Sequence, residues 1–171
     1  MTPSLFLTDP RIEYRDAFRS MVRDYMQARE QIYINLYKPA LGNFEKYVAL
    51  LHHYARGHKI PSHEVPHSTY WLTDSTGKIY GNIRVRHQAL QVYGHIGYDI
   101  RPSFRGQGMG NLLLWLGLEK ARDLGITRVK IACDERNKPS TRIIERNGGV
   151  FIERLYDRKT RLFVNRYYID L

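Results

Sequence analysis

Three glycines at alternate positions mark the stretch Arg105-Gly106-Gln107-Gly108-Met109-Gly110, which directly precedes a segment with helical periodicity. A glycine inside a helix costs about 1 kcal/mol relative to alanine, so three of them at a helix start indicate that bare backbone is needed there. The first amides of a helix lack internal partners, and the helix dipole adds partial positive charge. The stretch therefore predicts a cradle for an anion such as a pyrophosphate, with a charge-assisted contact from Arg105.

Two common phosphate-binding motifs do not fit this stretch. A nucleoside-triphosphate loop needs Gly-Lys followed by Ser or Thr, which is absent. The dinucleotide fingerprint needs its third glycine one position later, where Asn111 stands. Asp134 could serve as its ribose-binding acid, but that fingerprint sits in a βαβ unit of a long parallel sheet, and here about a hundred residues of other structure come first.

The stretch resembles the acetyl-CoA loop of the GNAT superfamily of N-acetyltransferases, in which Arg or Gln is followed after two residues by Gly and then, one residue on, by Gly or Ala. Arg105, Gly108 and Gly110 match that pattern. The resemblance continues in the preceding segment 94–102 and in the following segment 129–149. It implies an enzyme that transfers an acetyl group from acetyl-CoA to a primary amine of a small molecule. The alternatives are a protein or peptide N-acetyltransferase, or a non-catalytic module that binds CoA or nucleic acid.

The resemblance also implies roles for individual residues. The pantetheine arm would pair with the strand around Ile100, and the backbone amide of Tyr98 would face the thioester oxygen as an oxyanion donor. Asn137 would bind the pantetheine amide, with Ser140 beside it. The pyrophosphate would be held by the backbone amides of Arg105, Gly106, Gln107, Gly108, Met109, Gly110 and Asn111.

Two proton transfers need candidates, because most amines are protonated at neutral pH and the leaving thiolate takes up a proton. His95 lies just before Tyr98 and titrates in the useful range, so it is the candidate base; a histidine satisfied within the sheet is the alternative. Many relatives place a proton-donating tyrosine where this chain has Ile144, so another group such as Tyr98 or a water would supply that proton, or the thiolate would leave unassisted. Cys133, on the neighbouring strand, is interpreted as a small apolar residue.

His63-Glu64-Val65-Pro66-His67 spells the metalloprotease pattern His-Glu-x-x-His. That pattern needs a helix to bring both histidines onto one face, and Pro66 argues against such a helix. No metal is therefore expected, and the loop is expected to border the acceptor pocket. Aromatic side chains that could line this pocket, or pack in the core, are Tyr33, Tyr37, Tyr70 and Trp71.

The periodicity predicts one domain over residues 1–171, an α/β (α+β) GNAT-like fold with a mixed, mostly antiparallel sheet and helices on both faces. A break is expected at Pro39 and Gly42. The expected elements are a strand over 4–8, a helix through 15–26, a helix that Asn43 caps and that closes near Gly57, strands over 69–73, 78–86 and 95–100, a helix over 109–124, a strand over 129–133, a helix over 137–147, and strands over 150–156 and 161–169.

The composition limits the binding partners and the cellular compartment that we expect for this chain. The 171 residues carry a net charge of +10, but the basic residues are dispersed rather than clustered as a nucleic-acid site would require. The apolar runs are too short to cross a membrane or to form a signal-peptide core, so no membrane contact is expected. A single cysteine, Cys133, forms no internal disulfide, which favours the cytoplasm. The final strand and the apolar first helix would suit a homodimer.

Overall fold

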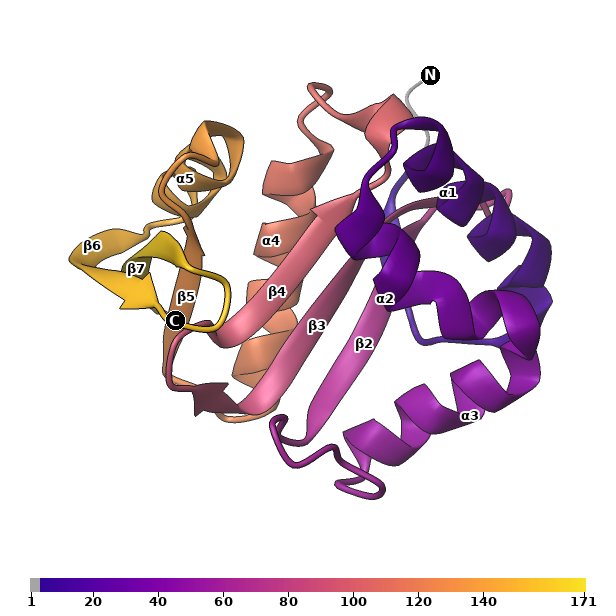
Figure 1. The fold of residues 1–171 in the computed structure, drawn as a ribbon, viewed down its shortest axis with the longest axis horizontal. Coiled ribbons are helices and arrows are strands. Elements are labelled where there is room, and N and C mark those ends of the chain that lie inside the picture. Colours follow the sequence, from indigo (N-terminus) through magenta and orange to yellow (C-terminus); the bar gives the residue numbers. More distant parts are fainter. Residues whose placement is uncertain (1–3) are drawn as a thin grey trace.

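The computed structural model describes residues 4–171, which form one seven-stranded sheet with helices on both faces (Figure 1). The strand order is β1-β2-β3-β4-β5-β7-β6, and every neighbouring pair is antiparallel except β4 and β5. The strands are β1 (Phe6–Thr8), β2 (His67–Thr73), β3 (Ile79–Leu90), β4 (Gly94–Ile100), β5 (Arg128–Asp134), β6 (Val150–Asp157) and β7 (Leu162–Asp170). The helices are α1 (Arg15–Gln27), α2 (Gln31–Gly42), α3 (Phe44–Ala55), α4 (Met109–Asp123) and α5 (Lys138–Arg146), with short 3₁₀ turns at Ile12–Tyr14 and Pro102–Phe104.

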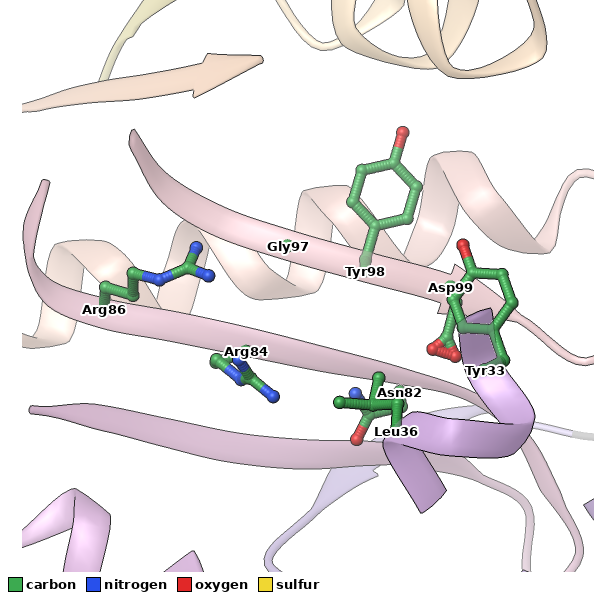
Figure 2. Close-up of a pocket in the computed structure, with 8 residues that line it drawn as sticks. All are labelled: Tyr33, Leu36, Asn82, Arg84, Arg86, Gly97, Tyr98 and Asp99. Carbon is green, nitrogen blue, oxygen red and sulfur yellow. The ribbon is translucent and has the colours of Figure 1, made fainter. Parts of the chain in front are cut away.

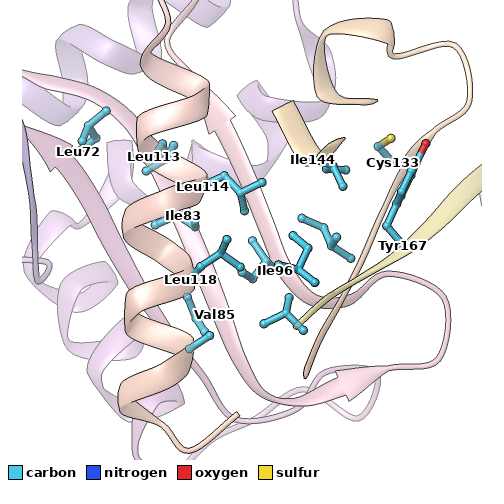
Figure 3. Packing of buried hydrophobic residues seen from close by; sticks show 14 of the residues in the cluster. Leu72, Ile83, Val85, Ile96, Leu113, Leu114, Leu118, Cys133, Ile144 and Tyr167 are labelled. Atoms are coloured by element: carbon cyan, nitrogen blue, oxygen red, sulfur yellow. The ribbon is translucent and has the colours of Figure 1, made fainter. Parts of the chain in front are cut away.

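The two faces of the sheet carry separate hydrophobic cores. On one face, α4 and α5 pack on β3, β4, β5 and β7, and Leu113, Leu114 and Ile144 are fully buried (Figure 3). On the other face, α1, α2 and α3 enclose an aromatic core around Trp71 and Phe18. From Gly81 to Arg86 the side chains of β3 therefore alternate, with Ile83 and Val85 in the core under α4 and Asn82, Arg84 and Arg86 on the other face. A register shift against β2 precedes this stretch, so that Tyr80 also packs in the core under α4 while Ile79 packs in the aromatic core.

The predicted fold class is confirmed, and the predicted elements occur in the expected order, including the capped start of α3; helix α2 was not predicted. The Asn43 side-chain oxygen accepts a hydrogen bond from the Lys46 amide at 2.8 Å, as an N-cap should. The first strand is shorter than expected, because it begins at Phe6 rather than at residue 4. No helix within residues 4–171 has the length and apolar character needed to span a membrane.

The predicted break at Pro39 was wrong. Helix α2 runs through Pro39 and ends only at Gly42. Proline in a helix interior costs about 3 kcal/mol because it lacks an amide hydrogen. The neighbouring Tyr37 and Ala40 are almost completely buried in the aromatic core, and burial of that helix face offsets the local cost.

The two parallel strands β4 and β5 are in contact at one end only. Gly94 and Ile96 pair with Ile131, and no pairing continues from Gly97 onward. Gly94 is indispensable to this junction because a Cβ atom there would lie 2.1 Å from the Lys130 carbonyl oxygen. The remainder of β4 therefore has an open edge facing β5, where another extended chain could pair.

Candidate functional site

The glycine-rich loop presents a run of backbone amides that have no partner. The Arg105 amide donates to the Pro102 carbonyl at 3.3 Å, and the Asn111 amide donates to the Gly108 carbonyl at 3.1 Å. Between them, the amides from Gly106 to Gly110 find no backbone acceptor anywhere in residues 4–171. Gly108 has φ +79° and caps α4, so the loop turns these amides outward at the positive end of the helix. Five such amides suit a pyrophosphate.

Arg105 uses its side chain within the protein. Its guanidinium Nη2 donates to Glu30 Oε2 at 2.9 Å and its Nε donates to the Ile100 carbonyl at 2.9 Å. The hydrogen bonds that Arg105 donates to the Glu30 carboxylate raise the pKa of Arg105. The side chain thus ties the loop both to the end of β4 and to the residue that precedes α2.

The open edge of β4 carries the amides of Tyr98 and Ile100. The Arg101 amide donates to the Tyr80 carbonyl at 2.9 Å, which marks a hydrogen-bonded pair between the end of β4 and β3. Such pairs recur every second residue in an antiparallel ladder, so the backbone groups of Asp99 also face β3, and those of Tyr98 and Ile100 face away from it. The Tyr98 amide therefore points toward the splayed edge, where an acyl carbonyl could accept its hydrogen bond.

The Tyr98 side chain lies on the opposite face from Asp99 (Figure 2) and reaches α5. Its hydroxyl lies 2.9 Å from Ser140 Oγ, and burial raises the pKa of Tyr98 to about 12. The Ser140 amide donates to the side-chain oxygen of Asn137 at 3.1 Å, which caps α5. Tyr98, Ser140 and Asn137 therefore form one polar cluster beside the gap between β4 and β5.

Ile144 and Cys133 contribute to packing beside this cluster (Figure 3). Ile144 is completely buried and carries no ionisable group, so it cannot donate a proton to a thiolate. Burial raises the pKa of the Cys133 thiol, and its Sγ lies 3.6 Å from Thr141 Oγ1. A thiol with a raised pKa is a poor nucleophile at neutral pH.

His95 lies at the closed end of the gap, separated from the other predicted site residues. Its Nδ1 accepts the Lys130 amide at 2.9 Å, so its Nε2 carries the proton of the neutral ring. Burial lowers the pKa of His95. Tyr98 is three residues further along β4, or roughly 10 Å at about 3.3 Å per residue. Tyr98 and its partner Ser140 therefore lie toward the open end of the gap, and His95 lies at the closed end.

A pocket of about 200 Å³ opens on the sheet face that α1, α2 and α3 cover. It borders the same segment of β4 as the Tyr98 amide, so the two substrates of a transfer reaction could meet across this strand. Figure 2 shows its lining residues, which are Tyr33 and Leu36 of α2, Asn82, Arg84 and Arg86 of β3, and Gly97, Tyr98 and Asp99 of β4.

Asp99 is the acidic residue of this pocket, and the sequence reasoning missed it. It is 5% exposed, and its Oδ1 accepts the hydroxyls of Tyr25 at 2.9 Å and Tyr37 at 2.7 Å. Burial raises the pKa of Asp99 to about 6, although the two tyrosine hydrogen bonds act in the opposite direction. Its ionised form is therefore present at neutral pH and can take up a proton. The sequence signal that could have revealed it is an acidic residue at a buried position of a strand in the middle of the sheet.

The loop that spells His-Glu-x-x-His is not helical, as Pro66 predicted. His67 begins β2, and its ring contacts the Val65 carbonyl at 2.8 Å. Within residues 4–171, no group of three or more histidine, cysteine or acidic side chains is arranged to hold a metal ion. Glu64 instead turns toward β3, where it meets Arg84 at 3.2 Å and Arg86 at 3.3 Å.

Of the aromatic residues expected around the pocket, Tyr33 lines it. Tyr37 points into the aromatic core and reaches the pocket only through its bond to Asp99. Trp71 is fully buried in that core, and Tyr70 packs against the opposite core. Core packing therefore accounts for Trp71 and Tyr70.

Comparisons with known proteins agree with this geometry. A family model described as the acetyltransferase (GNAT) domain matches residues 5–150, and no protein of curated function matches the chain. RimL, the ribosomal L7/L12 alpha-N-protein acetyltransferase, solved with coenzyme A, is 22% identical with a TM-score of 0.69 over 100% of this chain and 96% of that one. The Salmonella typhimurium acetyl transferase that modifies the N-terminal serine of L7/L12 is 19% identical (TM-score 0.67; 100% and 96% covered). The microcin C7 self-immunity acetyltransferase MccE, solved with acetyl-CoA and AMP, is 18% identical (TM-score 0.67; 100% and 94% covered).

Proposed function

The chain belongs to the GNAT family of acetyltransferases, and from this premise we propose that it acetylates the primary amine of a small molecule held in the pocket over β3 and β4. Acetyl-CoA is the cosubstrate. The observation that carries the proposal is that the free loop amides, the open edge of β4 and a pocket with a buried acid lie along one strand. The pocket volume of about 200 Å³ is below the usual range for drug-sized ligands, which favours a compact acceptor.

Candidate contacts exist for the pyrophosphate, the pantetheine arm and the acyl group of the cosubstrate. The amides from Gly106 to Gly110 would hold the pyrophosphate, and the open edge of β4 around Ile100 would pair with the pantetheine arm. Asn137 would bind a pantetheine amide through its Nδ2, because its side-chain oxygen already caps α5. When bound, acetyl-CoA supplies the activated acyl group. The Tyr98 amide would then stabilise negative charge that develops on the acyl oxygen.

Asp99 is our candidate for the group that receives the amine proton, directly or through a water. It lines the acceptor pocket, and the Tyr25 and Tyr37 hydroxyls hold its carboxylate in place. His95 stays the alternative base, although its Nδ1 is occupied by the Lys130 amide. The proton on the departing sulfur would come from the Tyr98 hydroxyl or from a water, because position 144 holds a buried isoleucine.

A peptide amino terminus is the second candidate acceptor. The specific observation in its favour is the apolar rim of the pocket on α2, where Ile32 is 80% exposed and Leu36 is 41% exposed. The two residues lie one helical turn apart, on the same side of α2, and Leu36 lines the pocket. A peptide chain leaving the pocket would cover both.

Two measurements test the proposed function. Calorimetric titration with acetyl-CoA should show one site, and a panel of amines and short peptides should release CoA thiol. Asp99→Asn should then reduce kcat by about 10²–10⁴-fold with unchanged CoA affinity, whereas His95→Gln should retain most of the activity. The reverse ranking of these variants would assign the base to His95. Absence of acetyl-CoA binding would reject the function itself.

A further inference from the structure

Building on the proposed function, we propose that Arg84 and Arg86 form an anion-binding subsite of the acceptor pocket, so that the preferred acceptor is an amine that also carries a carboxylate or phosphate a few bonds away. Both arginines project from β3 into the pocket that Asp99 closes at its other end (Figure 2). The pocket therefore presents a positive end and an acidic end. An acceptor with one amine and one anionic group complements both.

The burial of the two arginines is the first argument. Arg86 is only 7% exposed, and burial lowers the pKa of its guanidinium. Its Nη1, like the Nε of Arg84, is buried without a hydrogen-bond partner among residues 4–171. A buried guanidinium nitrogen without an acceptor is costly, and the fold does not explain two of them at alternate positions on the pocket side of one central strand. An anionic ligand would supply the missing acceptors.

The second argument is the charge balance. Within the part of the chain that the structure describes, Glu64 is the one carboxylate that forms an ion pair with the two guanidinium groups, and its distances of 3.2 Å and 3.3 Å are longer than the roughly 2.7–2.9 Å of a strong charge-assisted bond. One positive charge is therefore left over at this end of the pocket. Glu64 lies in the loop before β2 and is not among the residues that line the pocket, so its contacts with the arginines leave the pocket free.

The third argument is the spacing between the two ends. Arg84 pairs across the strands with Gly97, and Asn82 pairs with Asp99. A Cβ atom at position 97 would lie 3.8 Å from Nη1 of Arg86. Because this residue is glycine, that space beside the Arg86 guanidinium is free. Two residues along a strand span about 7 Å. That distance suits an amine near Asp99 and an anion near Arg84 and Arg86 in one compact molecule.

The test compares amines that share the same aminoethyl group but differ in charge. β-Alanine is paired with propylamine, and phosphoethanolamine is paired with ethanolamine, so the two pairs separate carboxylate from phosphate recognition. At least one anionic member should exceed its neutral partner by about 10- to 100-fold in kcat/KM, the effect of one charge-assisted hydrogen bond. The same compound should raise the thermal unfolding temperature of the CoA complex at millimolar concentration.

Variants assign that preference to the arginines. Arg86→Gln should remove it by lowering kcat/KM for the anionic amine alone, and Arg86→Lys should restore part of it. Arg158→Gln, which removes the same charge from the exposed turn between β6 and β7, should leave the preference intact. The proposal is overturned if neutral partners react equally well, if Arg86→Gln lowers both members of a pair alike, or if neither anionic amine reacts or stabilises the complex. If CoA still binds normally in the calorimetric titration, none of these results contradicts the proposed function.

Discussion

Replacement of Gly108 by alanine separates the folding role of the loop from its binding role. Gly108 has φ +79°, and a Cβ atom added there would meet nothing within 4 Å. The folding cost is therefore the strain of a left-handed alanine alone, about 1–2 kcal/mol. In a chain of this length that cost lowers the unfolding temperature by about 2–4 °C per kcal/mol. The variant should fold.

The variant should also weaken CoA binding, because the new methyl group stands where the loop amides face a ligand. Loss of one or two hydrogen bonds to a charged group, at about 1.5–3 kcal/mol each, weakens CoA binding by at least 10-fold. Gly125→Ala is the matched control: Gly125 follows the other end of α4, has φ +77°, and also has open space around a Cβ atom. It should show the same loss of unfolding temperature with unchanged CoA affinity.

Calorimetric titration with CoA and thermal unfolding of both variants measure the two effects. Equal CoA affinity in Gly108→Ala and Gly125→Ala would refute the assignment of the loop as the pyrophosphate site. If Gly108→Ala is unfolded at room temperature while Gly125→Ala is folded, the claim that the space beside this loop is open is refuted.

Three further outcomes are expected. Below a pH of about 6, kcat/KM should fall about tenfold per pH unit, because the base must be ionised and burial raises the pKa of Asp99 to about 6. A pH–rate profile of Asp99→Asn should lack this dependence. If the Tyr98 hydroxyl supplies the proton to sulfur, Tyr98→Phe should lower kcat in an assay of released thiol and leave CoA affinity unchanged in a calorimetric titration. An unaltered kcat would point to water as the proton donor. Ile144→Ala should cost about 2–5 kcal/mol in denaturant unfolding, because the side chain is fully buried, and a smaller loss would mean that α5 collapses into the cavity.

The elements that depend on local sequence were predictable. Glycine spacing indicated the loop before α4, and Asn43 indicated the start of α3, because each acts on its own neighbours. The acceptor pocket was not predictable to the same degree. Asp99 meets Tyr25 and Tyr37 across more than sixty residues of chain, and nothing near Asp99 in the sequence announces those contacts. Glu64 was noticed for a metal pattern, whereas its partners lie on another element.

The pairing of Arg105 with Glu30 connects the two halves of the site mechanically. Arg105 stands at the entrance to the loop, and Glu30 directly precedes α2, whose Tyr33 forms part of the pocket wall. A displacement of the loop when it is filled would therefore be transmitted to that wall. Thermodynamic linkage then requires reciprocity: whatever factor the first substrate adds to the affinity for the second, the second adds to the first.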